Sequence, residues 1–146
     1  VNSTPVSVLM TRDCLSLTPN ATLDDALLLF QTRKIGALPV VNDEDKVVGV
    51  FTTADLMNAY RCLFGLGEKG SVLVSIEDNG DPQAMSKLVR AMEEAQLVFT
   101  RLVRTNGGHE SKPMIFLRIN TYNVRSVYKA LEAAGFTIHV PEEFKQ

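Results

Sequence analysis

The chain has 146 residues, of which 45% are hydrophobic and 22% charged, and its formal net charge is −2. This balance is typical of a globular protein with one ordinary domain or two small ones, and it excludes a strong electrostatic attraction to nucleic acid or to an anionic membrane. Apolar runs stay below the roughly 20 residues that a membrane span needs, and Cys14 and Cys62 form no CxxC pair, which favours a cytoplasmic, reduced protein.

The first half of the chain combines helical and extended patterns. Apolar residues recur at i, i+3, i+4 and i+7 from Leu23 and again from Leu56, which predicts two amphipathic helices. Between and before them lie three β-rich runs: CLSL (14–17), LPVV (38–41) and VVGVF (47–51). The predicted order over residues 14–64 is therefore β-α-β-β-α.

Two residue pairs have the spacing of a capping box with a carboxylate in its third helical position. These are Thr22 with Asp25, and Thr52 with Asp55. As a cap, Thr52 binds a backbone N–H of the first turn and Asp55 complements the positive helix end. The same geometry suits a ligand, because a helix N-terminus after a strand binds polar groups and a carboxylate accepts hydrogen bonds from both hydroxyls of a ribose. Gly49 leaves room for a ligand or another backbone, so both interpretations stay open.

The segment GLGEKG (65–70) divides the chain. It contains three glycines and cannot hold a helix well, so it is interpreted as a linker. Domains are accordingly expected at residues 1–64 and 71–146. Neither has the long alternating β/α series of a doubly wound fold, so two small α+β units are predicted.

The second half also mixes the two patterns. Helical spacing begins at Met85 and Val124, with Asp81-Pro82 predicted to cap the first helix, Asn123 the second, and Gly135 to end it. The β-rich runs are SVLVSIE (71–77), LVFTRLV (97–103), MIFLRIN (114–120) and FTIHV (136–140). The order β-α-β-β-α-β is that of a ferredoxin-like unit.

Residues 6–64 resemble a CBS domain. The resemblance rests on the LPVV strand, the acidic turn after it and the pattern G-h-h-T-x-x-D at 49–55. In ligand-binding CBS domains the Thr and Asp of this pattern contact the ribose of adenosine, which implies that role for Thr52 and Asp55. The resemblance also implies a lining for the base and its surroundings, formed by Leu15, Ser16, Ile35, Gly36, Ala37 and Pro39. AMP-binding relatives often have basic residues before the LPV strand, where this chain has Gly36 and Ala37.

CBS domains generally work as two repeats with ligand sites between them, whereas one repeat is visible here. The chain begins VNSTPVSV, without a methionine, which indicates a fragment or a processed chain, and this opening could be the linker from a preceding repeat. Alternatively, two chains pair. A single unit leaves an apolar face that needs cover, so a homodimer or higher homo-oligomer is expected.

Residues 71–140 resemble an ACT domain, a module that binds amino acids or similar effectors. The Asp-x-Pro-Gly turn of that family corresponds to Asp81-Pro82, but Gln83 stands at the glycine position. The candidate effector residues are Asp78, Asn79 and Asp81, which are also good turn and cap residues. The order of the two units resembles the C-terminal part of the acetoin-utilisation protein AcuB family.

Other chemistry is weakly represented. His109 and His139 have no Cys or His at ligand spacing, so no metal site is expected. No catalytic residues are predicted, because the chain has no nucleophile–base motif, P-loop or G-x-G-x-x-G. Arg101, Arg104 and Arg118 lie on adjacent predicted strands, and without stacking aromatics they indicate a solvated or interface face rather than a nucleic-acid site.

These patterns together predict a regulatory protein rather than an enzyme. The CBS half is expected to sense an adenine-containing ligand such as AMP, ATP, ADP or S-adenosylmethionine, with no other cofactor. The ACT-like half is expected to dimerise and to sense a second small molecule. The alternatives are an oligomerisation scaffold that binds no ligand, and the regulatory tail of a larger enzyme.

Overall fold

The computed structural model describes residues 3–107 and 111–139, and the chain forms two compact units, Val1–Leu63 and Phe64–Gln146. Both units mix helices with antiparallel strands, so the predicted α+β class is confirmed. Each unit has its own cluster of buried apolar side chains. The two are therefore described one after the other.

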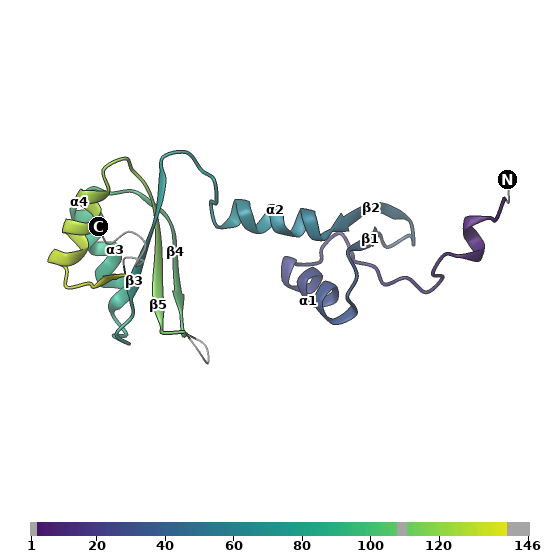
Figure 1. Ribbon diagram of the computed structural model, residues 1–146, viewed down its shortest axis with the longest axis horizontal. Coiled ribbons are helices and arrows are strands. Elements are labelled where there is room, and N and C mark those ends of the chain that lie inside the picture. The colour runs from purple at the N-terminus through teal and green to yellow at the C-terminus, as the bar shows by residue number, and fades with distance from the viewer. Residues whose placement is uncertain (1–2, 108–110, 140–146) are drawn as a thin grey trace. The chain divides into compact units, whose positions relative to one another are not determined.

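The first unit is built on a β-hairpin and two helices (Figure 1). Its elements are the 3-10 helix η1 (Val6–Val8), α1 (Leu23–Arg33), β1 (Ala37–Val41), β2 (Val47–Thr52) and α2 (Thr53–Leu63). β1 pairs with β2 in antiparallel register, with Ala37 opposite Thr52 and Pro39 opposite Val50. The predicted helices and the hairpin are thus present in the predicted order.

The predicted strand at 14–17 is wrong in extent, since it is reduced to one parallel bridge between Leu17 and Val40. Leu17 donates its N–H to the carbonyl of Pro39 at 2.9 Å and accepts from the N–H of Val41 at 2.8 Å. Extending this parallel pairing back to Leu15 would require an N–H on residue 39, which proline lacks. The ladder therefore stops after one bridge.

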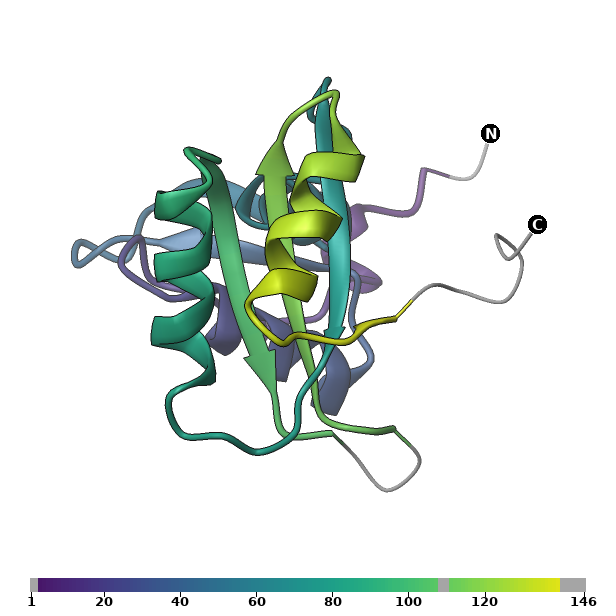
Figure 2. The same ribbon diagram turned by 90° about the vertical axis from the view of Figure 1, so that its left-hand side faces the viewer.

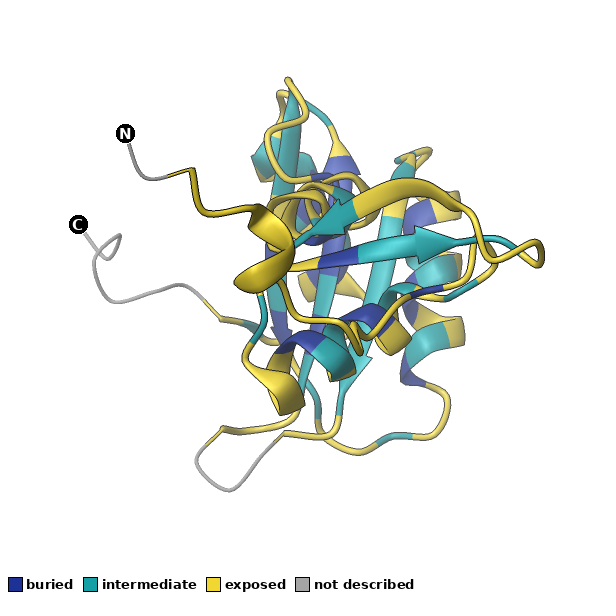
Figure 3. Cartoon of the chain, turned by 90° about the vertical axis from the view of Figure 1, so that its right-hand side faces the viewer, coloured by how far each residue is buried: buried dark blue, intermediate teal, exposed yellow. Residues whose placement is uncertain are grey.

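The core of the first unit is small. Its buried members are Leu17, Ala26, Phe30, Leu38 and Leu56, and the rings of Phe30 and Phe51 stack with centroids 6.2 Å apart. The predicted stripe of α2 is only partly buried, because Leu56 is enclosed while Leu63 is 56% exposed. Figure 3 shows that most of β2 is exposed. The unit by itself leaves apolar surface uncovered.

The second unit is a four-stranded antiparallel sheet with two helices. Its elements are β3 (Ser71–Glu77), α3 (Ala84–Glu94), β4 (Phe99–Thr105), β5 (Met114–Asn120), α4 (Val124–Ala133) and β6 (Ile138–His139). The strand order is β4-β5-β3-β6. Figure 2 shows α3 and α4 on the same face of the sheet. The predicted sequence of elements, β-α-β-β-α-β, is therefore the observed one.

The helix-covered face of the sheet holds the core. Alternate residues of the strands point into it, as the period of two requires. The buried members are Val74, Ile76, Ala84, Leu88, Met92, Ile115, Leu117, Ile119, Val127 and Leu131. The helical stripes predicted from Met85 and Val124 accordingly pack against this face.

The C-terminal ends of α3 and α4 are each followed by a residue with positive φ. Gln96 adopts φ +55° after α3, and Leu97 donates to the carbonyl of Met92 at 2.9 Å, which closes the helix with a Schellman-type turn. The strand predicted at 97–103 therefore begins later, at Phe99. The predicted end of α4 at Gly135 is confirmed, with φ +83°.

The predicted start of α3 is wrong. Asp81-Pro82 does not cap it, because the helix begins at Ala84 with Gln83 as its N-cap residue. Asp81 instead accepts from the N–H of Gln83 through its side chain at 2.8 Å and from the N–H of Ala84 through its carbonyl at 3.0 Å. These bonds form a turn of their own before the helix.

The glycine segment 65–70 belongs to the second unit. It consists largely of turns, and Glu68 forms an ion pair with Arg101 at 2.8 Å. The carbonyl of Gly70 accepts from the N–H of Thr121 at 2.9 Å. Gly65 has φ +66°, a conformation that side-chain-bearing residues rarely adopt, and a Cβ there would also displace the end of the Arg101 side chain.

Candidate functional site

Thr52 and Asp55 form a complete capping box at the start of α2. Asp55 Oδ2 accepts from the backbone N–H of Thr52 at 2.9 Å and from its hydroxyl at 2.6 Å. The N–H of Asp55 in turn donates to Thr52 Oγ1 at 3.2 Å. The hydrogen bonds from the Thr52 hydroxyl and then from its backbone lower the pKa of Asp55, so its carboxyl is ionised at neutral pH.

Thr22 and Asp25 form the same box at the start of α1. The corresponding distances are 2.9 Å, 2.7 Å and 3.2 Å, and hydrogen bonds from Thr22 also lower the pKa of Asp25. The cap geometry alone therefore does not distinguish a ligand site, since both predicted boxes are formed equally well. The residues around each capping box must therefore decide which box could belong to a ligand site.

Around Thr52 the structure gathers most of the predicted adenosine-site residues at one end of the hairpin. Ala37 lies directly opposite Thr52, and the carbonyl of Gly36 accepts from the N–H of Thr53 at 3.1 Å. A Cβ built on Gly36 would meet nothing within 4 Å, so the backbone is open at this end of the hairpin. The same holds for Gly49, which lies opposite Val40 toward the other end.

The remaining predicted residues flank the same strand. Pro39 is half-buried in β1, and Ile35 packs against the core of the unit. Leu15 and Ser16 are exposed and precede Leu17, which bridges to the free edge of β1. The set therefore surrounds β1.

A hollow that the sequence did not indicate lies beside the other capping box. It encloses about 200 Å³. Its lining is formed by Leu17, Thr18, Pro19, Ala21, Thr22, Leu23, Ala26, Val40 and Phe51. None of the eight predicted adenosine-site residues belongs to it. Its walls are mainly apolar side chains of the core, and a pattern search for polar ligand residues would not find it.

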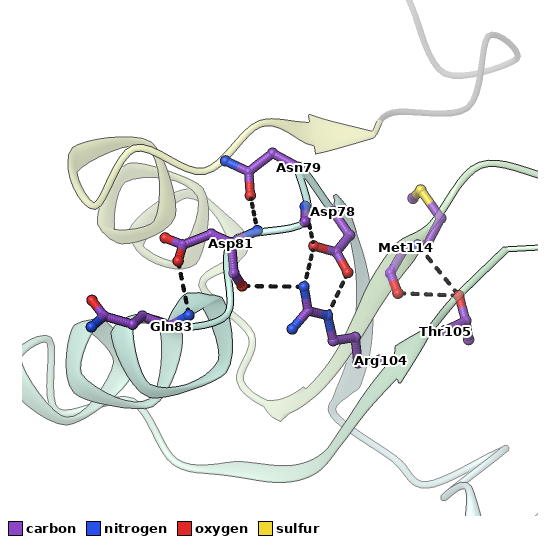
Figure 4. Close-up of polar contacts among 8 residues, drawn as sticks. Asp78, Asn79, Asp81, Gln83, Arg104, Thr105 and Met114 are labelled. Atoms are coloured by element: carbon purple, nitrogen blue, oxygen red, sulfur yellow. Dashed lines mark hydrogen bonds and ion pairs between the residues drawn. The ribbon is translucent and has the colours of Figure 1, made fainter.

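In the second unit the three candidate effector residues line one hollow of about 210 Å³. Each side chain stabilises the turn that it belongs to, as Figure 4 shows for the residues drawn. Asp78 accepts from the N–H of Gly80 at 2.9 Å, and Asn79 from the N–H of Asp81 at 3.0 Å. Residues of the α4–β6 connection, including Thr137, complete the lining. The residues that form the turn therefore also form one wall of the hollow.

Arg104 holds this turn and was not predicted to do so. Its Nε donates to Asp78 Oδ2 at 2.5 Å, and a terminal nitrogen donates to Asp78 Oδ1 at 2.9 Å and to the carbonyl of Asp81 at 3.1 Å (Figure 4). The hydrogen bonds from Arg104 are the main cause that lowers the pKa of Asp78, and the same bonds raise the pKa of Arg104. The bidentate pair fixes the turn on β4.

Two further features of this turn bear on ligand binding. Lys87 forms an ion pair with Asp81 at 2.6 Å and is the main cause that lowers the pKa of Asp81. Gln83 has φ −92°, which needs no glycine, whereas Gly80 has φ +81°. The position of this turn that favours glycine is therefore Gly80.

The expected face of three arginines is wrong. Arg101 and Arg118 are direct partners on one face of the sheet, whereas Arg104 points to the other side and to Asp78. Residues 101 and 104 are an odd number apart on one strand, so they cannot share a face.

Within residues 3–107 and 111–139, no group of three His, Cys, Asp or Glu residues could hold a metal ion. His109 lies outside the described residues, and His139 is exposed. In the same part of the chain, no helix has both the length and the apolar character to cross a membrane.

The sequence model of the CBS domain family matches residues 6–61. These residues form a CBS domain. The match includes both capping boxes and the whole β1–β2 hairpin. CBS domains are generally regulatory or sensory modules.

Three proteins of Methanocaldococcus jannaschii are similar to this region. Uncharacterized protein MJ1225 is 34% identical over 55 residues, which cover 38% of this chain and 20% of that protein. Uncharacterized protein MJ1426 is 39% identical over 56 residues, covering 38% of this chain and 33% of that protein. Inosine-5'-monophosphate dehydrogenase is 38% identical over 45 residues, covering 31% of this chain and 9% of the enzyme. The chain thus spans a third or less of each.

The crystal structure of MJ1225, which is described as a proposed archaeal homologue of g-AMPK, aligns with a TM-score of 0.38 and 32% identity. The alignment covers 40% of this chain and 21% of that one. An uncharacterised conserved protein from Pyrococcus horikoshii aligns over 94% of this chain and 96% of its own, with a TM-score of 0.36 and 22% identity.

Proposed function

We propose that this chain is a regulatory protein whose CBS unit binds an adenine-containing ligand, such as AMP, ADP, ATP or S-adenosylmethionine. The observation that supports this most directly is the orientation of Asp55. Its Oδ2 is used by the capping box, while the described residues offer its Oδ1 no hydrogen bond. An ionised, exposed oxygen at a helix N-terminus can accept from the hydroxyls of a ribose.

Thr52 has a supporting role in this site. Its hydroxyl donates to Asp55 and accepts from the N–H of Asp55, so it has little capacity left for a ligand. Thr52 therefore positions the carboxylate instead of contacting the sugar as its main partner. The open space at Gly36 admits the sugar, and Ile35 and Leu15 offer apolar surface to a base.

The phosphate groups need a cation from elsewhere. Gly36 and Ala37 stand where AMP-binding relatives carry basic residues. Arg33 and Lys34, at the end of α1, complement the negative end of that helix. A second CBS repeat, from another copy or another part of the full protein, is the proposed source of the missing positive charge.

The adenosine site is tested by replacing Asp55 with asparagine. We expect calorimetric titration of the four ligands to give saturable heat with the wild-type chain for at least one of them. Asp55→Asn should weaken that binding by about tenfold or more, because a hydrogen bond to a charged acceptor contributes roughly 1.5–3 kcal/mol.

Asp25→Asn is the matched control, because it breaks the other capping box with the same chemistry. It should lower helix stability to a similar extent and leave ligand affinity unchanged. Equal losses of affinity in both variants would show that the effect comes from helix capping and would reject the site at Asp55.

Assembly is proposed to proceed through the exposed side of β2. Val48 and Val50 point to the same side of that strand and are exposed. Met57 in α2 and Leu28 in α1 add exposed apolar surface to the unit. Such surface on a small CBS unit is proposed to be covered by a second CBS repeat.

The double variant Val48→Glu/Val50→Glu should shift the chain to monomer, because two carboxylates would be buried without partners. Sedimentation velocity measures the change. Val98→Glu, at an exposed position of the second unit, is the control and should leave the sedimentation coefficient unchanged. A wild-type monomer at high concentration would contradict self-association.

The second unit is proposed to be a ferredoxin-like, ACT-like domain that supports dimerisation or binds a small effector at Asp78, Asn79 and Asp81. The strand order and the hollow beside the turn support this. We also propose that the domains are residues 1–64 and 71–146. An arrangement like that of the AcuB family remains part of this proposal.

One observation favours a second candidate, a scaffold that binds no nucleotide. Both polar residues of the proposed site already satisfy one another, and the hollow within the CBS unit lies elsewhere. An oligomer whose mass is the same with and without every nucleotide would support the scaffold. The match to part of inosine-5'-monophosphate dehydrogenase is the basis of a third candidate, in which the chain is the regulatory part of an enzyme.

A further inference from the structure

The segment that opens the second unit, residues 64–70, lies across two arginines of the sheet. Arg101 of β4 and Arg118 of β5 are register partners, and Arg118 alternates with the core residues of its strand, so both lie on the face opposite α3 and α4. A Cβ built on Gly65 would stand 2.5 Å from Arg101 Nη1 and 2.9 Å from Arg118 Cδ. The backbone of residues 64–70, which we call the strap, therefore covers this pair.

The strap encloses a cation that lacks a counter-ion. Arg118 is only 8% exposed, and within the described part of the chain no ion pair includes it. Its Nη1 donates to Ser71 Oγ at 3.1 Å, whereas its buried Nε has no hydrogen-bond partner among the described residues. Enclosing a charge in this way is costly, and an unsatisfied buried donor stores strain. Closure of the strap therefore works against the solvation of Arg118.

The attractions that oppose this cost are modest. Glu68 pairs with Arg101 at 2.8 Å, but its side chain is 40% exposed, and ion pairs in contact with solvent contribute little to stability. Phe64 and Leu66 are 41% and 49% exposed, so they bury only part of their apolar surface. All three glycines of the strap have positive φ, and glycine loses more conformational entropy on ordering than any other residue. The two sides of the balance are therefore close.

We propose that the strap is a releasable cover, poised between the closed state of the structure and an open state in which water reaches Arg118. Release breaks the Glu68–Arg101 pair and the hydrogen bond from the Ser71 N–H to the Glu68 carbonyl, which is 3.2 Å long. The strap precedes β3, so the sheet itself stays paired. This device belongs to the second unit alone and goes beyond the proposed binding of a nucleotide.

The Nε–H of Arg118 is a direct reporter of the open state, because only release of the cover exposes it to water. Exchange with water, measured by NMR on the full chain, should give this group a protection factor between two references. The Nε–H of Arg125, exposed in α4, should be less protected, and the amide of Leu117 in the core more protected. Protection of Arg118 equal to that of either reference would overturn the proposal.

Glu68→Gln should accelerate this exchange about two- to fivefold, the range expected from losing a partly exposed ion pair. Glu132→Gln, at an exposed position of α4, removes the same charge away from the strap and is the matched control. It should leave the exchange of Arg118 unchanged. Equal exchange in wild type and Glu68→Gln would show that the ion pair does not hold the cover and would reject the mechanism.

Gly65→Ala disfavours closure through the backbone. An alanine at φ +66° is strained, and its Cβ would displace the Arg101 guanidinium from Glu68. Exchange of the Arg118 Nε–H should rise about tenfold. Gly80→Ala introduces the same kind of strain at φ +81° in open space and should leave that exchange unchanged. Equal acceleration in both variants would mean that the exchange follows the stability of the whole unit, which contradicts a local cover.

Arg118→Met tests the sign of the effect. It removes the enclosed charge and the unsatisfied donor, so the closed state should gain, and the Ser71 amide should exchange about fivefold more slowly or less. If Arg118 instead fastens the strap through Ser71 Oγ, the same substitution would accelerate that exchange. Faster exchange of the Ser71 amide in Arg118→Met would therefore reject the proposal.

Discussion

Replacing Leu117 by alanine is expected to lower the free energy of unfolding of the second unit by about 2–5 kcal/mol. Leu117 is fully buried at the centre of β5, between β3 and β4. Removing its side chain leaves a cavity beneath α3 and α4 that a well-packed core cannot fill. Since a domain of this size is only marginally stable, the variant should be close to unfolding.

Leu73→Ala is the matched control. Leu73 lies on the neighbouring strand β3, on the face of the sheet opposite α3 and α4, and is partly exposed. It should change stability much less. Hydrogen exchange measured by mass spectrometry can follow the two units separately. Exchange in β3, β5 and α4 should rise in Leu117→Ala, whereas residues up to Leu63 should keep wild-type protection. A rise throughout the chain would show that the two cores unfold as one.

The features that could be predicted from the sequence are those with local causes. A Thr and an Asp three residues apart form both capping boxes, and Gly135 ends α4 in a left-handed turn. The strand predicted at 14–17 is longer than the observed single bridge, because these residues favour extended structure while the partner strand carries Pro39. The missing N–H of that proline acts only once the two segments are side by side.

The pairing of Arg104 with Asp78 could not be predicted in the same way. The two residues are far apart in the chain, and the register of β4 shifts between Phe99 and Arg101. Because a shift of one residue moves every side chain to the opposite face, sequence alone does not say which arginine of β4 reaches the turn. The spacing of Arg101 and Arg104 does show that they face opposite sides.

The adenosine site shows the limit for function. The structure brings Thr52, Asp55, Gly36 and Ala37 together at one end of a hairpin, and their contact with a ligand stays a prediction of the CBS pattern. It could not distinguish a ligand contact from a cap, because Thr22 and Asp25 reproduce every hydrogen bond of the box. The surroundings of the two boxes differ, because Thr52 lies beside the open backbone of Gly36 and Thr22 lines a hollow of about 200 Å³, and these surroundings depend on the fold and not on the motif.

Arg104→Met is expected to lower the thermal midpoint of the second unit clearly, whereas Lys87→Met should change it little. The side chain of Asp78 is only 4% exposed. Without Arg104 its buried carboxylate keeps the hydrogen bond from the N–H of Gly80 but loses its ion pair, which is destabilising. Lys87 pairs with Asp81 at the surface, where such pairs contribute little. Adding Asp78→Asn to Arg104→Met should recover stability, because the unpaired charge is then removed.

The same variants should differ in their response to acid. The pKa of Asp78 is lowered in the folded protein, mainly by Arg104, so its contribution to stability is fully present above the unfolded pKa of about 3.9. That contribution is lost as the pH falls through the lower, folded pKa. Thermal melts of the second unit between pH 7 and pH 2 should therefore show a smaller acid-dependent loss in Arg104→Met than in wild type or Lys87→Met. Parallel curves for all three would mean that Arg104 does not hold the turn electrostatically, and the hollow beside Asp78 would then owe its shape to the backbone bonds of the turn alone.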